Sequence, residues 1–114
     1  MLGANARRQK ILAVMNVRRH DTFDNLANEF GVSKRTIRYD IEYLSVGYPI
    51  YTVSGRYGGG VYIMDGCQAD KKYLSIEQSD LLSNLSSKLS DKDKTVMESI
   101  LKEFSIPRNG GKAS

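Results

Sequence analysis

The chain has 114 residues, of which 17 are Lys or Arg, 13 are Asp or Glu, one is His and one is Cys. This length fits one domain, or one small domain with an appendage. The apolar runs fall far short of the roughly 18 to 20 residues that a membrane-spanning helix requires, and the N-terminus lacks the apolar core and cleavage site of a secretory signal. These features argue against a transmembrane protein and make a cytoplasmic location the expectation.

The single cysteine, Cys67, has no partner for an intramolecular disulfide, and one His supplies too few ligands for a structural zinc site. We therefore expect no metal and no cofactor, and an inert thiol at Cys67. His20 stands beside Asp21 but has no nucleophile next to it, so we interpret it as a surface histidine in a loop. Without paired carboxylates or a nucleophile with its base, an enzyme is not expected.

The formal net charge of +4 is unevenly distributed. Residues 1–66 contain nine basic and six acidic residues, whereas residues 67–114 contain eight and seven. The basic residues of the first part are mostly arginine, whose planar fork suits phosphate and guanine edges, and those of the second part are nearly all lysine. This asymmetry assigns the function to the first 66 residues.

Apolar residues at helical spacing predict a first helix over residues 6–17, with Arg7 and Arg8 on its polar side. Thr22 is a suitable N-cap for a short second helix, which is expected to end at Gly31. Glycine readily adopts the left-handed conformation that follows a helix C-terminus. A tight turn is therefore predicted directly after this helix.

The third helix is predicted to follow the N-cap Ser33, because Ile37, Ile41 and Leu44 form a single apolar stripe. Lys34 lies in its first turn, near the positive end of the helix dipole, where a phosphate would also bind. Two helices joined by a turn that contains glycine make a helix-turn-helix unit. The opposite face of the third helix holds Arg35, Tyr39 and Glu42, with Thr36 and Arg38 on its flanks.

Two β-prone runs, 50–53 and 61–64, flank a glycine-rich turn and predict a β-hairpin. Arg56 and Tyr57 lie at its tip. The glycine run at 58–60 is not a nucleotide-binding loop, because no helix begins after it. A helix-turn-helix followed by such a hairpin is a winged helix.

Three strings mark this region: FGVS at 30–33, RTIRYDI at 35–41 and GYPI at 47–50. Together with the glycine-rich hairpin, they closely resemble the DNA-binding domain of DeoR-type and WYL-type bacterial transcription regulators. The biotin-repressor winged helix is similar too. The resemblance covers roughly residues 6–66.

The resemblance implies that helix 33–44 enters the major groove of DNA and that wing 50–64 lies along the backbone or the minor groove. Regulators of this family continue into a ligand-sensing domain, whereas only 48 residues follow Gly66 here. The resemblance implies base or phosphate contacts at Arg35, Thr36, Arg38, Tyr39 and Arg56. To these we add as candidate DNA-binding residues Ser33, Lys34, Tyr57, Arg7 and Arg8.

Residues 67–106 predict a helical hairpin. Ser75 and Gln78 form a capping-box pattern that leads into Leu81, Leu82, Leu85 and Leu89, and Ser90 caps the second helix. The hairpin is too small to enclose a small-molecule ligand, but its apolar surface makes it a candidate dimerisation element. We expect the tail, residues 107–114, to be disordered.

The predicted fold is mainly α with a small β-hairpin: a winged helix-turn-helix domain over residues 1–66 followed by the helical hairpin. We expect Asp40 to pair with an arginine of the first helix, and Arg38 either to contact DNA or to pair with Asp40 or Glu42. The leading hypothesis is a transcription regulator that binds double-stranded DNA as a homodimer. The alternative is a protein-interaction module, an anti-repressor or adaptor, whose binding would depend little on salt.

Overall fold

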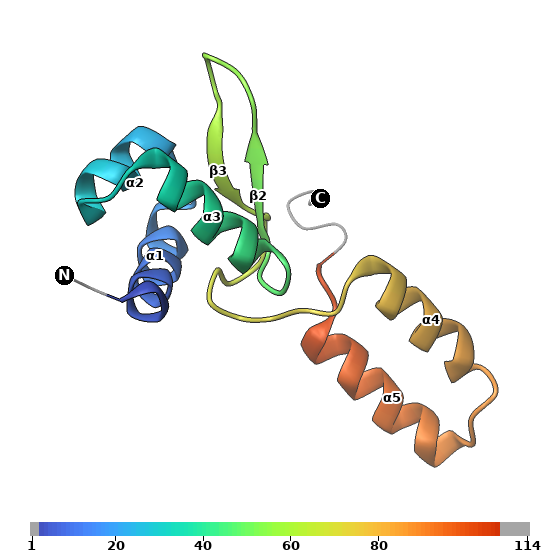
Figure 1. The fold of residues 1–114 in the computed structure, drawn as a ribbon. Helices are drawn as coiled ribbons and strands as arrows, with labels where there is room; N and C mark the ends of the chain where they lie inside the picture. The colour runs from blue at the N-terminus through green and yellow to red at the C-terminus, as the bar shows by residue number, and fades with distance from the viewer. Residues whose placement is uncertain (1–2, 108–114) are drawn as a thin grey trace. The chain divides into compact units, whose positions relative to one another are not determined.

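The computed structural model describes residues 3–107, and within them the chain forms five helices and three short strands (Figure 1). It divides into two compact units, with the boundary between Lys71 and Lys72. This confirms the predicted fold class, a mostly helical winged helix-turn-helix with a C-terminal helical hairpin. The elements of the first unit are α1 (Ala4–Arg18), β1 (His20–Asp21), α2 (Phe23–Phe30), α3 (Lys34–Ser45), β2 (Ile50–Val53) and β3 (Gly60–Ile63), and those of the second are α4 (Ile76–Ser86) and α5 (Asp91–Phe104).

The ends of α2 and α3 are set by the caps that the sequence predicts. The Thr22 hydroxyl accepts a hydrogen bond from the Asn25 amide at 3.0 Å, and the Ser33 hydroxyl accepts one from the Thr36 amide at 3.1 Å. Gly31 ends α2 in the left-handed conformation, at φ 68°. Because each cap satisfies an amide that the helix leaves unpaired, the turn between the two helices is short and well defined.

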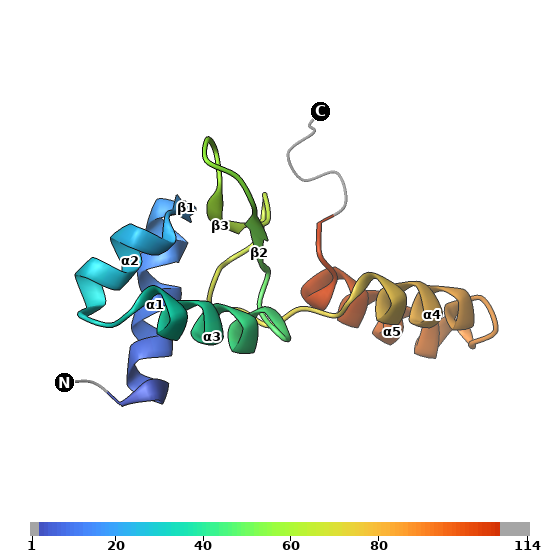
Figure 2. The same ribbon diagram turned by 45° about the horizontal axis from the view of Figure 1, so that its top comes forward.

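The core of the first unit lies between α1, α3 and the sheet. The apolar stripe of α3 is buried as predicted, and α3 passes across α1 in Figure 2. Full burial of a large aliphatic side chain stabilises a fold by about 1.5 to 3 kcal/mol. Among residues 3–107, the apolar side chains with no exposed surface are those of Ile11, Leu12, Met15, Leu26, Ile37, Val61 and Ala69.

The sheet is antiparallel with the strand order β1-β3-β2. The prediction of a loop at His20 and Asp21 is wrong, since these two residues pair with β3 as strand β1. Two residues are too few to show strand periodicity, and their partners lie about forty positions away in the sequence. Tyr62 pairs with both His20 and Tyr51, and the three rings stack at centroid distances of 4.1 and 5.5 Å.

The hairpin β2–β3 extends beyond the short strand β1 as the wing (Figure 2). Gly60 begins β3 at φ 137°, and a Cβ at this position would lie 2.4 Å from the carbonyl oxygen of Asp21. Glycine is therefore required where the wing leaves the three-stranded part of the sheet.

After β3, Cys67 and Ala69 are buried, and the Ala69 amide donates to Asn16 Oδ1 at 2.8 Å. The segment after the wing is thus attached to α1.

The second unit is a helical hairpin. The predicted capping box at Ser75 and Gln78 begins α4, and the Ser90 hydroxyl caps α5. Helix α4 ends at Ser86, so Leu89, which was predicted to continue its stripe, lies in the connection. The amide of Leu89 donates to the carbonyl of Ser86, and this turn closes the connection before the cap of α5. Of the tail predicted to be disordered, residues 108–114 lie outside the described residues.

Candidate nucleic-acid interface

The side of α3 opposite its apolar stripe is exposed and carries planar cationic and aromatic groups. Arg35 Nε lies 3.4 Å from the Tyr39 hydroxyl, to which it donates, and the Arg35 guanidinium is 5.9 Å from the centre of the same ring. Tyr39 is 55% exposed. Two side chains suited to hydrogen bonding and stacking with bases therefore lie together in the first two turns of this face.

Arg38 lies on the flank of α3 that faces α2. Its guanidinium carbon is 4.5 Å from the centre of the Phe23 ring, a cation–π contact with the first residue of α2. Of the alternatives that the sequence left open for Arg38, pairing with Asp40 or Glu42 is not observed within residues 3–107. Arg38 and Phe23 both line an open groove.

That groove runs between the start of α2, the first turns of α3 and the wing, and encloses about 380 Å³. Lys34 and Arg38 line it from α3, and Arg56 lines it from the wing. Asp24 lines it as well and forms an ion pair with Lys34 at 3.2 Å. Since both partners of this pair are more than half exposed, it adds little stability and leaves the lysine available to a stronger anion. We call this feature the cationic groove.

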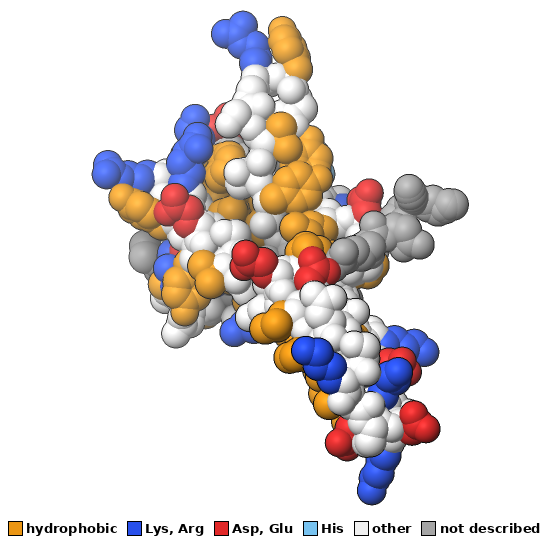
Figure 3. Space-filling model, turned by 90° about the vertical axis from the view of Figure 1, so that its right-hand side faces the viewer, with side chains coloured by type: hydrophobic (Ala, Val, Ile, Leu, Met, Phe, Trp, Pro, Cys, Tyr) orange, Lys and Arg blue, Asp and Glu red, His pale blue; other side chains and the backbone are white. Residues whose placement is uncertain are grey.

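The tip of the wing is fully open to solvent. Arg56 is exposed and Tyr57 is 88% exposed. Basic and hydrophobic side chains project from the top of the space-filling view, where the hairpin tip lies (Figure 3). Nothing in the described structure restrains these two side chains, so they are free to contact a ligand.

Arg7 and Arg8 occupy a different position from the other candidates, because both bind Asp40 of α3. Arg7 donates to the Asp40 carboxylate from Nε at 2.5 Å and from Nη2 at 2.9 Å, and Arg8 donates from Nε at 2.9 Å. The hydrogen bond to Asp40 raises the pKa of Arg7 above its ordinary value. Arg8 also lies 4.0 Å over the ring of Tyr43. The predicted pairing of Asp40 with the first helix is confirmed, and it holds α3 against α1.

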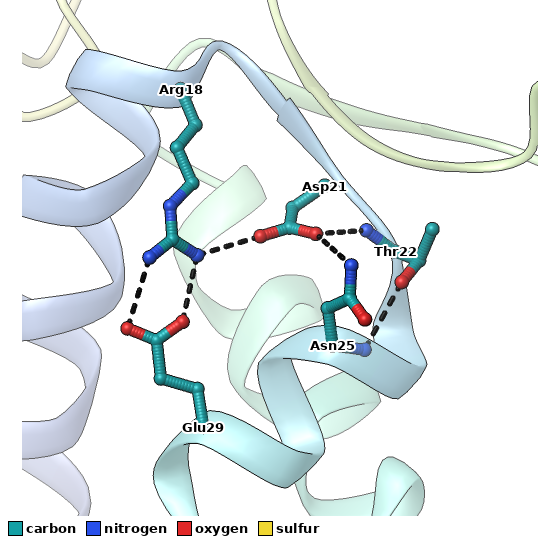
Figure 4. Close-up of polar contacts among 5 residues, drawn as sticks. All are labelled: Arg18, Asp21, Thr22, Asn25 and Glu29. Atoms are coloured by element: carbon teal, nitrogen blue, oxygen red, sulfur yellow. Dashed lines mark hydrogen bonds and ion pairs between the residues drawn. The ribbon is translucent and has the colours of Figure 1, made fainter.

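A second polar network, which the sequence did not reveal, joins α1, β1 and α2 (Figure 4). The Arg18 guanidinium donates to Asp21 at 2.7 Å and to both carboxylate oxygens of Glu29 at 2.7 and 3.0 Å. Asp21 accepts further hydrogen bonds from the Thr22 amide and the Asn25 side chain. Burial alone would raise the pKa of Asp21, but the hydrogen bonds from Arg18, Thr22 and Asn25 outweigh it and lower that pKa.

The two candidate residues with aliphatic hydroxyls, Ser33 and Thr36, lie at the start of α3. Ser33 is its N-cap, and the Ser33 hydroxyl donates to Thr36 Oγ1 at 3.1 Å.

The structure thus brings the candidate residues of α3 and of the wing together around the cationic groove and the exposed face of α3 next to it. Arg7 and Arg8 lie apart from this set. Sequence reasoning missed the role of Phe23 in orienting Arg38. The only available signal was an aromatic residue at the start of α2, and its partner was not apparent.

Residues 7–61 match a protein-family model described as an HTH domain. The matched segment runs from α1 into β3. Comparisons with curated proteins and with solved structures give no match. Across residues 3–107, none of the helices combines the length and the hydropathy needed to cross a membrane. The family match supports a helix-turn-helix domain over residues 7–61, where the structure has α2 and α3 joined by a tight turn.

Proposed function

We propose that this chain is a sequence-specific transcription regulator that binds duplex DNA, as DeoR-type and WYL-type regulators do. The cationic groove is the observation that carries the proposal. Lys34 and Arg38 come from α3 and Arg56 comes from the wing, so two separate elements direct positive charge into one open channel. A DNA phosphate backbone is the polyanion that such a channel fits, because arginine and lysine on both sides neutralise successive phosphates.

In this arrangement α3 enters the major groove and the wing follows the backbone or the minor groove. Lys34, Arg38 and Arg56 bind phosphates, while Arg35 and Tyr39 reach base edges, with arginine suited to the O6 and N7 atoms of guanine. The start of α3 adds backbone amides that favour a phosphate. We assign supporting contacts to the groups next to these: Ser33, Thr36 and Tyr57.

Arg7 and Arg8 have a structural role, which is to position α3. Their guanidinium groups are largely occupied by Asp40, and their side chains are only 13% and 20% exposed. They therefore set the angle of α3 on the domain, and with it the angle at which α3 meets DNA.

We also propose that the chain binds as a homodimer through residues 67–106, with residues 1–66 as the DNA-binding part. Helix α5 buries none of its side chains, and α4 buries only Ser79 and Ser86. Leu81, Leu85 and Ile100 are each at least 40% exposed. A helical hairpin lacks a core of its own. Because a second copy of the chain exposes the same apolar side chains, two hairpins can pack together as a four-helix bundle.

The dimer is tested by sedimentation equilibrium of the wild type and of Ile100→Glu. The proposal predicts a dimeric wild type and a monomeric variant, because a charge would then be buried in the bundle. Glu98→Gln is the control, since Glu98 is exposed and lies on the opposite side of α5 from Ile100. A monomeric wild type at micromolar concentration would overturn the dimer and leave the DNA-binding proposal intact.

DNA binding is tested by selection from a random duplex library at near-physiological salt, followed by sequencing of the bound fraction. The proposal predicts a two-fold symmetric motif whose half-sites lie about one helical turn apart. A single half-site would refute the dimer only. Retention without enrichment would refute sequence specificity, and no retention at all would favour the protein-interaction module.

A further inference from the structure

Glu42 is the one acidic side chain that helix α3, described over its whole length, exposes to solvent. It lies two turns after Arg35 on the same side, because residues seven positions apart nearly coincide around a helix. Among residues 3–107 no ion pair includes its carboxylate. Arg38, one turn earlier, lies over the Phe23 ring instead. A negative charge without an ion-pair partner thus lies on the face proposed to bind DNA, in the second half of α3.

Glu42 lies at a groove next to the cationic groove. Glu42 lines a second open groove, between α3 and β2, together with Ile41 and Tyr51. The two grooves adjoin each other, and the residues that line both are Phe23, Arg38 and Thr52. A duplex held in the cationic groove by its phosphates would therefore bring base edges toward Glu42.

A carboxylate at such a place has few suitable partners on DNA. It only accepts hydrogen bonds, and it is repelled by phosphate oxygens. In the major groove the amino donor of adenine lies between two acceptors, N7 and the O4 of the paired thymine, whereas the N4 amino group of cytosine adjoins only one. Cytosine is therefore the base whose edge best matches a glutamate.

We propose that Glu42 is a specificity-determining residue that accepts a hydrogen bond from the N4 amino group of a cytosine. This inference rests on the proposed function of α3 as the recognition helix. Arg35 and Glu42 are separated by about 10 Å along the helix axis, so the two side chains reach different base pairs. The binding site accordingly contains a guanine read by Arg35 and, at a separate position, a cytosine read by Glu42.

The test is a parallel selection from one random duplex library with the wild type, Glu42→Gln and Glu98→Gln. Glu98→Gln removes the same charge from an exposed position of α5. We expect the wild type and the control to enrich the same motif. Glu42→Gln should lose the preference for cytosine at one position by about tenfold or more and shift it toward adenine, which glutamine binds through N6 and N7. Circular dichroism checks that each variant is folded.

Two results would overturn the inference while the proposed function stands. If Glu42→Gln tightens binding to all sequences equally, the carboxylate only repels phosphates. If it enriches the wild-type motif unchanged, Glu42 does not touch the bases. If the wild type itself enriches no motif, sequence-specific binding fails, and the role of Glu42 fails with it.

Discussion

Replacing Asp40 by Asn should destabilise the first unit by about 3 kcal/mol, because Asp40 is the shared anion that holds α3 against α1. Its side chain is 1% exposed and receives hydrogen bonds from two arginines. Loss of one partner of a buried ion pair costs about 3 to 5 kcal/mol. The arginines, at 13% and 20% exposure, regain some hydration, which places the expected loss near the lower end.

Urea unfolding followed by tyrosine fluorescence measures this loss, since six of the seven tyrosines lie in the first unit. For a domain of this size the same loss lowers Tm by about 12 to 24 °C. Asp65→Asn is the matched control, because Asp65 is exposed and the change should stay within about 0.5 kcal/mol. A loss below about 1 kcal/mol for Asp40→Asn would refute the clamp between the two helices.

The remaining predictions concern DNA contacts and acid stability. Arg35→Ala should weaken binding to the selected duplex by about 1 to 3 kcal/mol and relax the base preference at one position. Fluorescence anisotropy with competing duplexes measures both quantities. If the variant keeps the base preference of the wild type, α3 is oriented differently on DNA. Arg56→Ala should weaken binding to all duplexes about equally, and a sequence-dependent loss in the same assay would contradict a phosphate contact. The lowered pKa of Asp21 means that its contribution to stability is present above its unfolded-state pKa of about 3.9 and is lost as the pH falls through the lower folded-state pKa. Unfolding free energy measured from pH 6 to pH 2 should therefore fall less steeply for Asp21→Asn than for the wild type, and parallel curves would refute the network around Arg18.

The parts of the fold that were predictable are those encoded by neighbouring residues. The caps Thr22, Ser33 and Ser75 act on amides three positions away, and Gly31 needs only its own conformational freedom. The stripe of α3 is visible because one face of a helix repeats every three to four residues. These local signals locate α2, α3 and the start of α4.

Features that depend on distant residues were not predictable. Strand β1 forms because His20 pairs with Tyr62. A strand of two residues is too short for its sequence to predict this partner. The Arg18 network joins residues from α1, β1 and α2 whose approach depends on the packed fold. Likewise, Arg38 meets Phe23 only once α2 packs beside α3. Asp40 was an exception, because a carboxylate at the edge of a buried stripe requires a cationic partner.

If the cationic groove holds DNA phosphates, its cationic side chains determine how steeply duplex binding weakens with salt. The measurement compares the wild type with the triple variant Lys34→Ala, Arg38→Ala and Arg56→Ala. As a control for the loss of three charges, it uses the exposed lysines of the second unit, in the variant Lys88→Ala, Lys92→Ala and Lys102→Ala.

Each phosphate contact contributes about 0.9 to the slope of log binding constant against log salt concentration. We expect the groove variant to bind more weakly, with a slope shallower by about 2.7, and the lysine control to keep the wild-type slope. Equal slopes for the wild type and the groove variant would show that the cationic groove does not hold DNA phosphates.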